Sequence, residues 1–473
     1  MRSLTKRLGR IVGPGAVLSR PEDVMLYEYD AGLSTGAPEY VVFPETTEQV
    51  SQIARLASET GTALVPRGAG TGLSGGSIPR QGGIVLVFSR MTKILEIDAA
   101  NQRAVVQPGV VNADLSAATA KHRLYFAPDP ASQKACTIGG NVAENSGGAH
   151  TLAHGITVNH ITGLEVVLPD GRVVQMGGKA VDCCGYDLTG LFVGTEGTVG
   201  IVTAITVKLT RVAEAVETLL AIFNTVDDAA NTVTTIIAEG ITPVALEMLD
   251  GQTLRCVEEA THAGYPLDSG AVLLIELEGL REAVTEQAES TREVCNRHHA
   301  REVRRATNEQ ERQLLWKGRK TAFASLGRLS PAYYTQDGVV PRSYIPKVLR
   351  YIEGVAKKYE LRIGNIFHAG DGNLHPCILF DLRDPEQVRR THEAGREILT
   401  YCVQVGGTIT GEHGVGMEKN DLMPLLFTED DLEVMKRVHD AFNPQSVLNP
   451  QKLFPTPRSC RETNAVPSNG GRL

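Results

Sequence analysis

The chain has 473 residues, of which 42% are hydrophobic and 22% are charged, and it carries a formal net charge of -8. Its length exceeds what one compact core usually accommodates, which predicts two or more domains. The negative charge argues against nucleic-acid binding, because that function needs concentrated lysine and arginine. The 48 glycines cluster in a few segments, which is typical of backbone that approaches a ligand closely.

The eight cysteines include the neighbours Cys183 and Cys184 but form no C-x-x-C pair and no iron–sulfur ligand spacing. This pattern predicts a reducing compartment, and we interpret the two neighbours as packing residues because no helper base lies near them in sequence. Residues 1–15 lack the apolar segment of a signal peptide, and no run reaches the roughly 20 apolar residues that span a bilayer. We therefore expect a cytoplasmic protein, with at most peripheral contact with the inner face of the plasma membrane.

Up to residue 212 the sequence predicts an α+β domain of short strands separated by glycine-rich turns. Thr46 and Gln49 have capping-box spacing and open an amphipathic helix that ends at Gly61. The β-branched runs that follow predict strands over residues 63–65, 84–88, 104–107, 164–168, 173–176 and 200–209.

From residue 213 the character of the sequence changes. Long polar helices, notably one over residues 280–315, alternate with strands such as 271–278. Residues 430–442 predict one further helix, followed by a turn over 443–453 and a Pro/Ser/Gly-rich tail. We therefore divide the chain into the domains 1–212 and 213–427, a C-terminal segment 428–455 and a mobile tail 456–473.

The first glycine loop, residues 66–76, contains a G-x-G-x-x-G match at residues 70–75. In a Rossmann unit this motif opens a helix directly, so that a phosphate meets the helix N-terminus. Pro79, Gly82 and Gly83 forbid that helix here, which disfavours NAD binding of the Rossmann type. A Walker A motif is also absent, because no Gly-Lys-Ser/Thr follows the loop.

Two more glycine-rich loops, residues 137–148 and 194–200, have the same character as the first. Any one of them could be a tight turn. Three in one domain indicate a single long anionic ligand that crosses it, such as a diphosphate dinucleotide.

A histidine-rich stretch, residues 365–380, predicts two strands joined by a four-residue loop at 370–373. In that register His368 faces His375, with Cβ atoms ~5 Å apart. Glu412 and His413 lie between glycines further along the chain. Two histidines and a carboxylate suit zinc, manganese or another divalent ion with an open coordination position.

Residues 66–76, 128–149, 185–209 and 443–453 resemble the FAD-contacting segments of the vanillyl-alcohol-oxidase/para-cresol-methylhydroxylase flavoprotein superfamily. Within it the chain is most similar to the glycolate oxidase branch of FAD-linked oxidases, which includes a flavin-binding component of that enzyme and is kin to D-lactate and D-2-hydroxyglutarate dehydrogenases. The resemblance implies an α+β fold with a two-part N-terminal FAD-binding domain of the PCMH type, its core at about 37–212. A ferredoxin-like antiparallel-sheet cap domain follows, and the C-terminal helical segment returns to complete the FAD site.

The resemblance also implies which residues contact FAD. They are Pro66, Arg67, Gly68, Ala69, Gly70, Thr71, Gly72, Ser74, Gly75, Pro128, Ser132, Gly139, Gly140, Asn141, Ala143, Asn145, Gly147, Gly148, Glu196, Gly197, Gly200, Ile201, Val202 and Asn449. Many relatives attach the flavin through a histidine in the first glycine loop. Residues 66–76 contain none, so we expect non-covalent FAD.

At the substrate the resemblance implies that His368, His375 and Glu412 bind a divalent metal and that His413 is the catalytic base. Arg319 matches the family's arginine for the substrate carboxylate, and Asn373 matches a polar substrate contact.

Phe323 and Thr335 stand where the hydroxyglutarate enzymes carry a Thr and a Lys that help to bind substrate. The missing lysine argues against a dicarboxylate substrate.

The expected function is therefore flavin-dependent oxidation of a small 2-hydroxy acid, glycolate or D-lactate, by hydride transfer to N5 of FAD. Electrons would leave to a partner subunit or a quinone-linked acceptor, and the resemblance implies a second FAD-type subunit and an iron–sulfur subunit. The alternatives are a D-lactate or D-2-hydroxyglutarate dehydrogenase that acts alone, an FAD-binding scaffold subunit, or a metal-dependent hydrolase without flavin.

Overall fold

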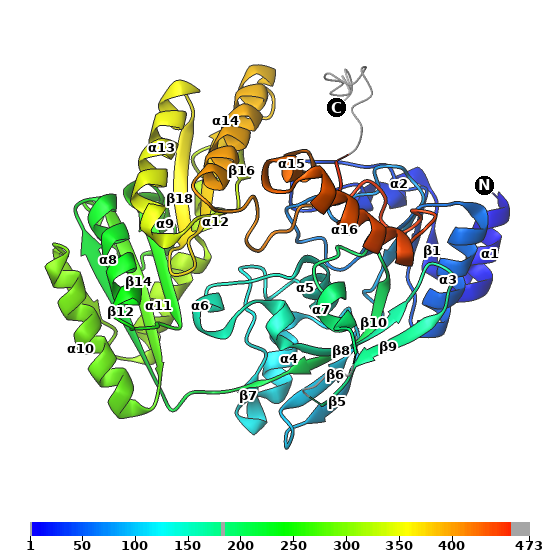
Figure 1. Cartoon of the computed structure of the whole chain (residues 1–473), viewed down its shortest axis with the longest axis horizontal. Coiled ribbons are helices and arrows are strands. Elements are labelled where there is room, and N and C mark those ends of the chain that lie inside the picture. Colours follow the sequence, from blue (N-terminus) through cyan, green and yellow to red (C-terminus); the bar gives the residue numbers. More distant parts are fainter. Residues whose placement is uncertain (1, 181–184, 456–473) are drawn as a thin grey trace.

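The computed structural model describes residues 2–180 and 185–455, so the predicted tail 456–473 and the pair Cys183–Cys184 lie outside the described residues. The predicted mixture of helices and strands is confirmed. Strands from the first 211 residues form small sheets, and the strands from residue 215 onwards form one large sheet beside them (Figure 1). No helix within residues 2–180 and 185–455 combines the length and hydropathy needed to cross a membrane.

The first small sheet contains four strands, in the order β1 (Val17–Leu18), β2 (Tyr40–Val42), β4 (Ile84–Val87) and β3 (Leu64–Arg67). Both β2 and β3 run parallel to β4. Helix α3 (Thr47–Thr60) links β2 to β3 and packs with α1 (Arg2–Val12) in one apolar core. As predicted, the Thr46 hydroxyl accepts a hydrogen bond from the Gln49 N–H, and Gly61 ends the helix in the left-handed conformation.

The second small sheet is antiparallel and contains five strands, in the order β5 (Ile94–Asp98), β6 (Arg103–Val106), β10 (Ile201–Lys208), β8 (Ile161–Val167) and β9 (Val173–Gly177). Burial alternates along β10, as it does in a strand with one face on the core. Around the two sheets lie the shorter elements α2 (Pro21–Val24), α4 (Asn112–Thr119), β7 (Leu124–Tyr125), α5 (Ile138–Glu144), α6 (Thr151–His154), α7 (Leu188–Phe192) and β11 (Thr210–Arg211).

The large sheet is antiparallel throughout, in the order β15 (Glu302–Arg305), β12 (Ala215–Phe223), β14 (Ala271–Gly279), β13 (Ala245–Asp250), β18 (Arg362–His368), β19 (Asn373–Phe380) and β16 (Ala332–Thr335). The short strand β17 (Gly338–Val339) also pairs with β19.

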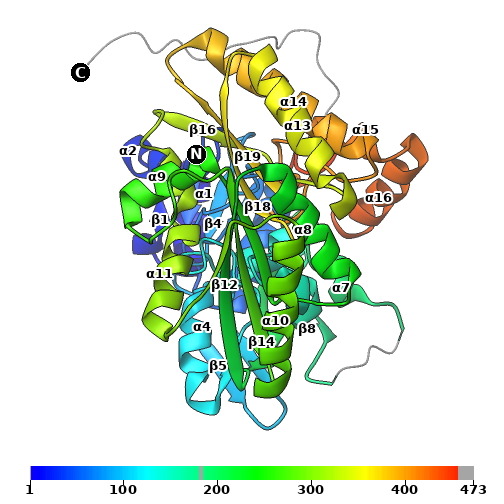
Figure 2. The same cartoon turned by 90° about the vertical axis from the view of Figure 1, so that its left-hand side faces the viewer.

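Helices cover both faces of the large sheet. One face packs against α8 (Val226–Ala238), α10 (Arg281–Arg297), α13 (Ile345–Lys358) and α14 (Pro385–Gln404). The other face packs against α9 (Gly251–Thr261), α11 (Glu309–Lys320) and α12 (Ala322–Leu326). Figure 2 shows α10 and α11 on opposite sides of β12 and β14.

The prediction of one continuous helix over residues 280–315 is wrong, because that stretch contains all of α10, the edge strand β15 and the start of α11. The break follows His299, which has a positive φ of 63°, and the new helix begins at Asn308, whose side chain accepts from the Glu311 N–H. Polar periodicity continues through all three elements because each has one face in solvent, so it could not reveal the break.

After the large sheet the chain returns to the small sheets through α15 (Met423–Leu426) and α16 (Glu429–Phe442), which are orange to red in Figure 1. The turn that follows α16 makes a bridge between Leu64 and Leu448. Asn443 donates from its side chain to the carbonyls of Thr198 and Leu448. Residues far apart in sequence therefore meet at the edge of the first small sheet.

Candidate active site

A cavity of about 300 Å³ lies between the small sheets and the large sheet. Its lining includes parts of all three glycine-rich segments, and it also includes Arg319, His368, Glu412 and His413. The two groups of residues that the sequence singled out therefore share one cavity.

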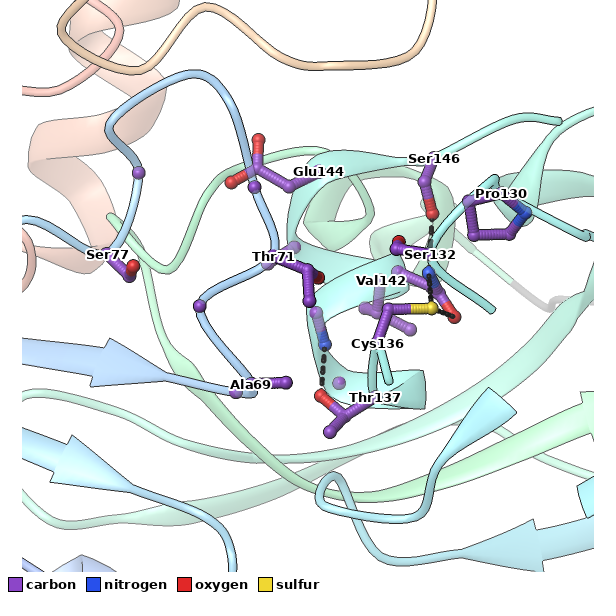
Figure 3. Close-up of a pocket in the computed structure, with 18 of the residues that line it drawn as sticks. Ala69, Thr71, Ser77, Pro130, Ser132, Cys136, Thr137, Val142, Glu144 and Ser146 are labelled. Carbon is purple, nitrogen blue, oxygen red and sulfur yellow. Dashed lines mark hydrogen bonds between the residues drawn. The ribbon is translucent and has the colours of Figure 1, made fainter. Parts of the chain in front are cut away.

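The first glycine loop leaves the end of β3 and crosses beside α5. Gly70 and Gly75 have φ values of 70° and 75°, which other residues rarely adopt. A Cβ at Gly68 would lie 2.5 Å from the Thr137 hydroxyl, so this backbone position needs glycine. Figure 3 shows Ala69 and Thr71 of this loop beside Thr137 and Val142.

The second segment is not a loop throughout, which corrects the prediction. Residues 138–144 form helix α5, capped by the Thr137 hydroxyl, which accepts from the Gly140 N–H at 3.3 Å (Figure 3). A Cβ at Gly139 would lie 2.6 Å from Cβ of Pro108. Thr137, Gly139 and Gly140 line the cavity, so the positive end of this helix borders it and favours an anionic ligand there.

The third segment forms turns, as predicted. Its hydrogen bonds connect the part of the molecule that holds the small sheets to residues that follow the large sheet in the chain. Glu196 accepts from the backbone N–H groups of Val415 and Gly416, at 2.7 and 2.8 Å. Asn449 donates to the carbonyl oxygens of Gly76 and Glu196, at 2.8 and 2.6 Å.

Most of the residues predicted to contact FAD line the cavity: Pro66, Arg67, Gly68, Ala69, Gly70, Thr71, Gly72, Ser132, Gly139, Gly140, Asn141, Ala143, Glu196, Gly197, Gly200, Ile201 and Val202. Others lie behind that lining, namely Ser74, Gly75, Pro128, Asn145, Gly147, Gly148 and Asn449. Several of these support the segments that do line it; Ser74, for instance, accepts from the Gly76 N–H.

The sequence prediction missed Asp30, Ser77 and Glu144 in the lining. Glu144 ends α5, where Figure 3 shows its carboxylate directed towards the first glycine loop. Burial raises the pKa of Glu144 well above its ordinary value, and Glu196 raises it further. The one sequence signal for Glu144 was its place inside the second glycine-rich segment.

The predicted loop of the histidine hairpin lies one residue too far along the chain, so the predicted partner of His368 is wrong by two residues. The loop covers residues 369–372, and His368 lies directly opposite Asn373, whereas His375 lies opposite Ile366. The two histidines are diagonal neighbours on one face of the sheet, with ring centroids 5.1 Å apart. The corrected register still brings both imidazoles together.

His368, His375 and Glu412 converge as predicted. The Nε2 atoms of His368 and His375 lie 3.2 and 3.3 Å from Oε1 of Glu412, and one potential ligand atom from each residue lies within 4.8 Å of the others. Burial opposes ionisation of Glu412, but His368 and His375 outweigh it and lower the pKa of Glu412 to about 2. Within residues 2–180 and 185–455, the buried Nδ1 of His375 has no hydrogen-bond partner. Two imidazole nitrogens and an ionised carboxylate form a donor set that fits a divalent metal.

His413 stacks on His375 with ring centroids 4.9 Å apart and an interplanar angle of 5°. Burial lowers the pKa of His413 to about 4, although Asp337 opposes the shift, so its imidazole is neutral near pH 7. A neutral imidazole that borders the cavity can accept a proton.

Asp337 is a residue that the sequence prediction missed. This fully buried carboxylate accepts from the backbone N–H of His413, from Nζ of Lys419 and from Nδ2 of Asn373, at 3.0, 3.2 and 2.9 Å. It also belongs, with His375 and His413, to a second group with metal-ligand spacing. The predicted substrate contact Asn373 is thus hydrogen-bonded to Asp337 and does not line the cavity. The single Asp between two short strands carried no signal in the sequence.

Arg319 lies in the last turn of α11, is 4% exposed and borders the cavity. Its guanidinium forms an ion pair with Glu247. Phe323 and Thr335 line the cavity beside it, together with Tyr333. This side of the cavity therefore combines one cation with aromatic rings.

Two family models match the chain. Residues 38–177 match the FAD binding domain, and residues 212–453 match the domain described as FAD linked oxidases, C-terminal domain. Glycolate oxidase subunit GlcD of Escherichia coli (strain K12) is 45% identical, over 97% of this chain and 92% of its own length. D-lactate dehydrogenase of Archaeoglobus fulgidus is 34% identical, over 87% of this chain and 90% of its own.

Among solved structures, p-cresol methylhydroxylase with substrate bound superposes with a TM-score of 0.81 and 17% identity, over 96% of each chain. Alkyldihydroxyacetonephosphate synthase superposes with a TM-score of 0.75 and 16% identity, over 96% of this chain and 85% of its own. These structures share the fold of this chain, and the family models and the sequence relatives agree with each other. The chain therefore belongs to the family of FAD-linked oxidases.

Proposed function

We propose that the protein oxidises a small 2-hydroxy acid, with glycolate as the first candidate and D-lactate as the second. The observation that supports this most is the single cavity shared by the glycine-rich segments and by Arg319, Glu412 and His413. Relatives over most of the chain are named glycolate oxidase subunit and D-lactate dehydrogenase. The match to an FAD binding domain argues against the hydrolase without flavin.

FAD would be held without a covalent bond by the glycine-rich segments, because residues 66–76 contain no histidine. Residues 1–212 form the FAD-binding domain in this proposal, 213–427 form the ferredoxin-like cap, and 428–455 complete the FAD site. Bound FAD supplies the acceptor for the hydride that leaves the α-carbon of the acid.

His368, His375 and Glu412 would hold a divalent ion, zinc or manganese. The chemistry that such an ion would supply is Lewis-acid polarisation, which would lower the pKa of a substrate hydroxyl. His413 takes the hydroxyl proton, since burial keeps its imidazole neutral, and Asp337 holds the loop that carries it. Arg319 binds the substrate carboxylate, preferably in a bidentate manner.

The side of the cavity around Phe323 and Thr335 favours a substrate with one carboxylate. Neither of these two side chains is basic, and Arg319 is the cation that lines the cavity beside them. The second carboxylate of a dicarboxylate would have no cationic partner there, and burying an unpaired charge is costly.

Electrons would leave to another protein. The relatives from Escherichia coli and Bacillus subtilis are named subunits of glycolate oxidase. We propose a second FAD-type subunit and an iron–sulfur subunit as the partners, because this chain carries no iron–sulfur ligand spacing.

Replacing His413 by Asn tests the role of the base. We expect H413N to retain FAD and to lower kcat for the hydroxy acid about 10²- to 10⁴-fold, the usual contribution of a general base. The exposed His122 provides the control H122N, which should keep the wild-type rate. A wild-type kcat in H413N would contradict the assignment.

A further inference from the structure

Glu247 is a buried carboxylate in the middle of β13. It is 1% exposed, and its strand neighbours Leu246 and Met248 are equally buried. A lone charge in such a strand is destabilising unless partners compensate it. The explanation for this residue therefore has to come from its partners.

Glu247 has two such partners, and both belong to the active site proposed above. It lies directly opposite His368 in the pairing of β13 with β18, and its carboxylate oxygens lie 2.8 and 2.9 Å from Nδ1 of that histidine. The same carboxylate forms the ion pair with Arg319. One side chain thus contacts both a metal ligand and the substrate arginine.

The contact with His368 determines which ring nitrogen is free. If Nδ1–H donates to Glu247, the lone pair is on Nε2, and Nε2 is the atom that lies 3.2 Å from Glu412. A carboxylate behind a ligating histidine also makes that histidine a stronger ligand. The contact with Arg319 holds a guanidinium whose Nε is buried and has no hydrogen-bond partner among the residues that the structure describes.

We propose that Glu247 is a positioning residue that couples metal binding to substrate binding: it orients His368 towards the metal and Arg319 towards the substrate carboxylate. The inference rests on the proposed function, because it requires both a metal and an anionic substrate. The proposal predicts that a single substitution at Glu247 impairs both the binding of the metal and the binding of the hydroxy acid.

The test compares E247Q with wild-type protein, both with FAD bound and stripped of metal by a chelator. Zn²⁺ and Mn²⁺ are titrated separately, without hydroxy acid, in competition with a fluorescent metal indicator. KM and kcat for glycolate and D-lactate are then measured at saturating metal. E259Q is the control: Glu259 is an exposed carboxylate of α9, the helix that follows β13, and it undergoes the same chemical change.

We expect E247Q to weaken metal binding about 10- to 100-fold, the usual effect of removing such a partner. KM for the hydroxy acid should rise in the same variant, and E259Q should match the wild type in both measurements. Unchanged metal affinity in E247Q, or weakened metal affinity with an unchanged KM, would overturn the coupling.

If the wild type itself binds neither ion, the proposed metal site is wrong and the inference fails with it. If E247Q does not fold, E247D replaces it. This variant keeps the charge but is one methylene shorter and cannot reach both partners, so it should show both effects more weakly. If E247D then shows the wild-type metal affinity and the wild-type KM, the inference is overturned.

Discussion

At the scale of single residues, the site depends on a few buried charges that the fold places around one cavity. Arg319 is 4% exposed and its partner Glu247 1%, so their interaction is little screened by solvent. The carboxylates Glu412 and Asp337 are oriented by histidines and backbone N–H groups. Small changes in these side chains should therefore have large effects on binding.

Replacing Arg319 by Lys should raise KM for the hydroxy acid roughly 10- to 100-fold, because lysine cannot form the bidentate contact with a carboxylate. FAD content should not change. Steady-state kinetics at saturating metal measure the effect, and K317A, an exposed charge of the same helix, is the control. A KM in R319K equal to that of the wild type would show that another group binds the carboxylate.

At the scale of elements, the start of α5 is the feature that relates most directly to the cofactor. The Thr137 hydroxyl caps this helix, and its first turn borders the cavity. The N-terminal end of a helix is an anion site only while its backbone N–H groups are correctly held.

We expect T137V to weaken FAD binding about fivefold, which corresponds to the ~1 kcal/mol typical of a lost cap. T137S keeps the hydroxyl and should bind FAD like the wild type. Titration of FAD into protein freed of flavin measures both values. Equal affinity for FAD in T137V and T137S would show that the Thr137 cap of α5 does not contribute to FAD binding.

Prediction from sequence succeeded where local patterns determine the structure. The six predicted strands of the small sheets, the helix from Thr46 to Gly61 and the absence of a helix after the first glycine loop are confirmed, whereas β1, β2 and β5 were not predicted. The prediction failed where pairing with another strand determines the structure, since the edge strand β15 exists only through its pairing with β12. The residues of the turn could not distinguish a loop over 369–372 from one over 370–373, so the predicted partner of His368 was two residues too far along β19.

The prediction of the candidate site shows the same limit. Glu412 and His413 stand out in sequence because glycines flank the pair, and His368 and His375 stand out because they lie on either side of a glycine-containing turn. Glu247 and Asp337 do not, because one acidic residue among apolar ones signals nothing until the fold shows its partners.

At the scale of the whole molecule, a charged cluster joins the small sheets to the large sheet. His150 lies 2.9 Å from Asp129 on its own side and 3.5 Å from Glu276 of β14. Glu276 also forms an ion pair with Arg312 of α11, the helix that carries Arg319. The ion pairs of this cluster therefore connect the small sheets to the large sheet and to α11, and through α11 to the side of the cavity that Arg319 borders.

The cluster should make stability depend on pH. Burial opposes the charge on His150, but Asp129 and Glu276 outweigh it and raise the pKa of His150 to about 10. Because the folded-state pKa is above the unfolded value near 6.5, this stabilisation is fully present below pH 6.5 and is lost as the pH rises through 10. H150Q should therefore lower Tm at pH 7, and its deficit should shrink as the pH approaches 10. Thermal unfolding across this range measures the effect, and a deficit independent of pH would contradict it.

The central claim is that one cavity brings FAD and a small 2-hydroxy acid together, and anaerobic reduction of the flavin tests it most directly. Purified protein reconstituted with FAD and a divalent metal is mixed without oxygen with glycolate, D-lactate or D-2-hydroxyglutarate, and the visible flavin band is followed. We expect glycolate or D-lactate to bleach the band and D-2-hydroxyglutarate to leave it largely oxidised. A protein that cannot bind FAD, or a flavin that stays oxidised with every one of these acids, would contradict the account.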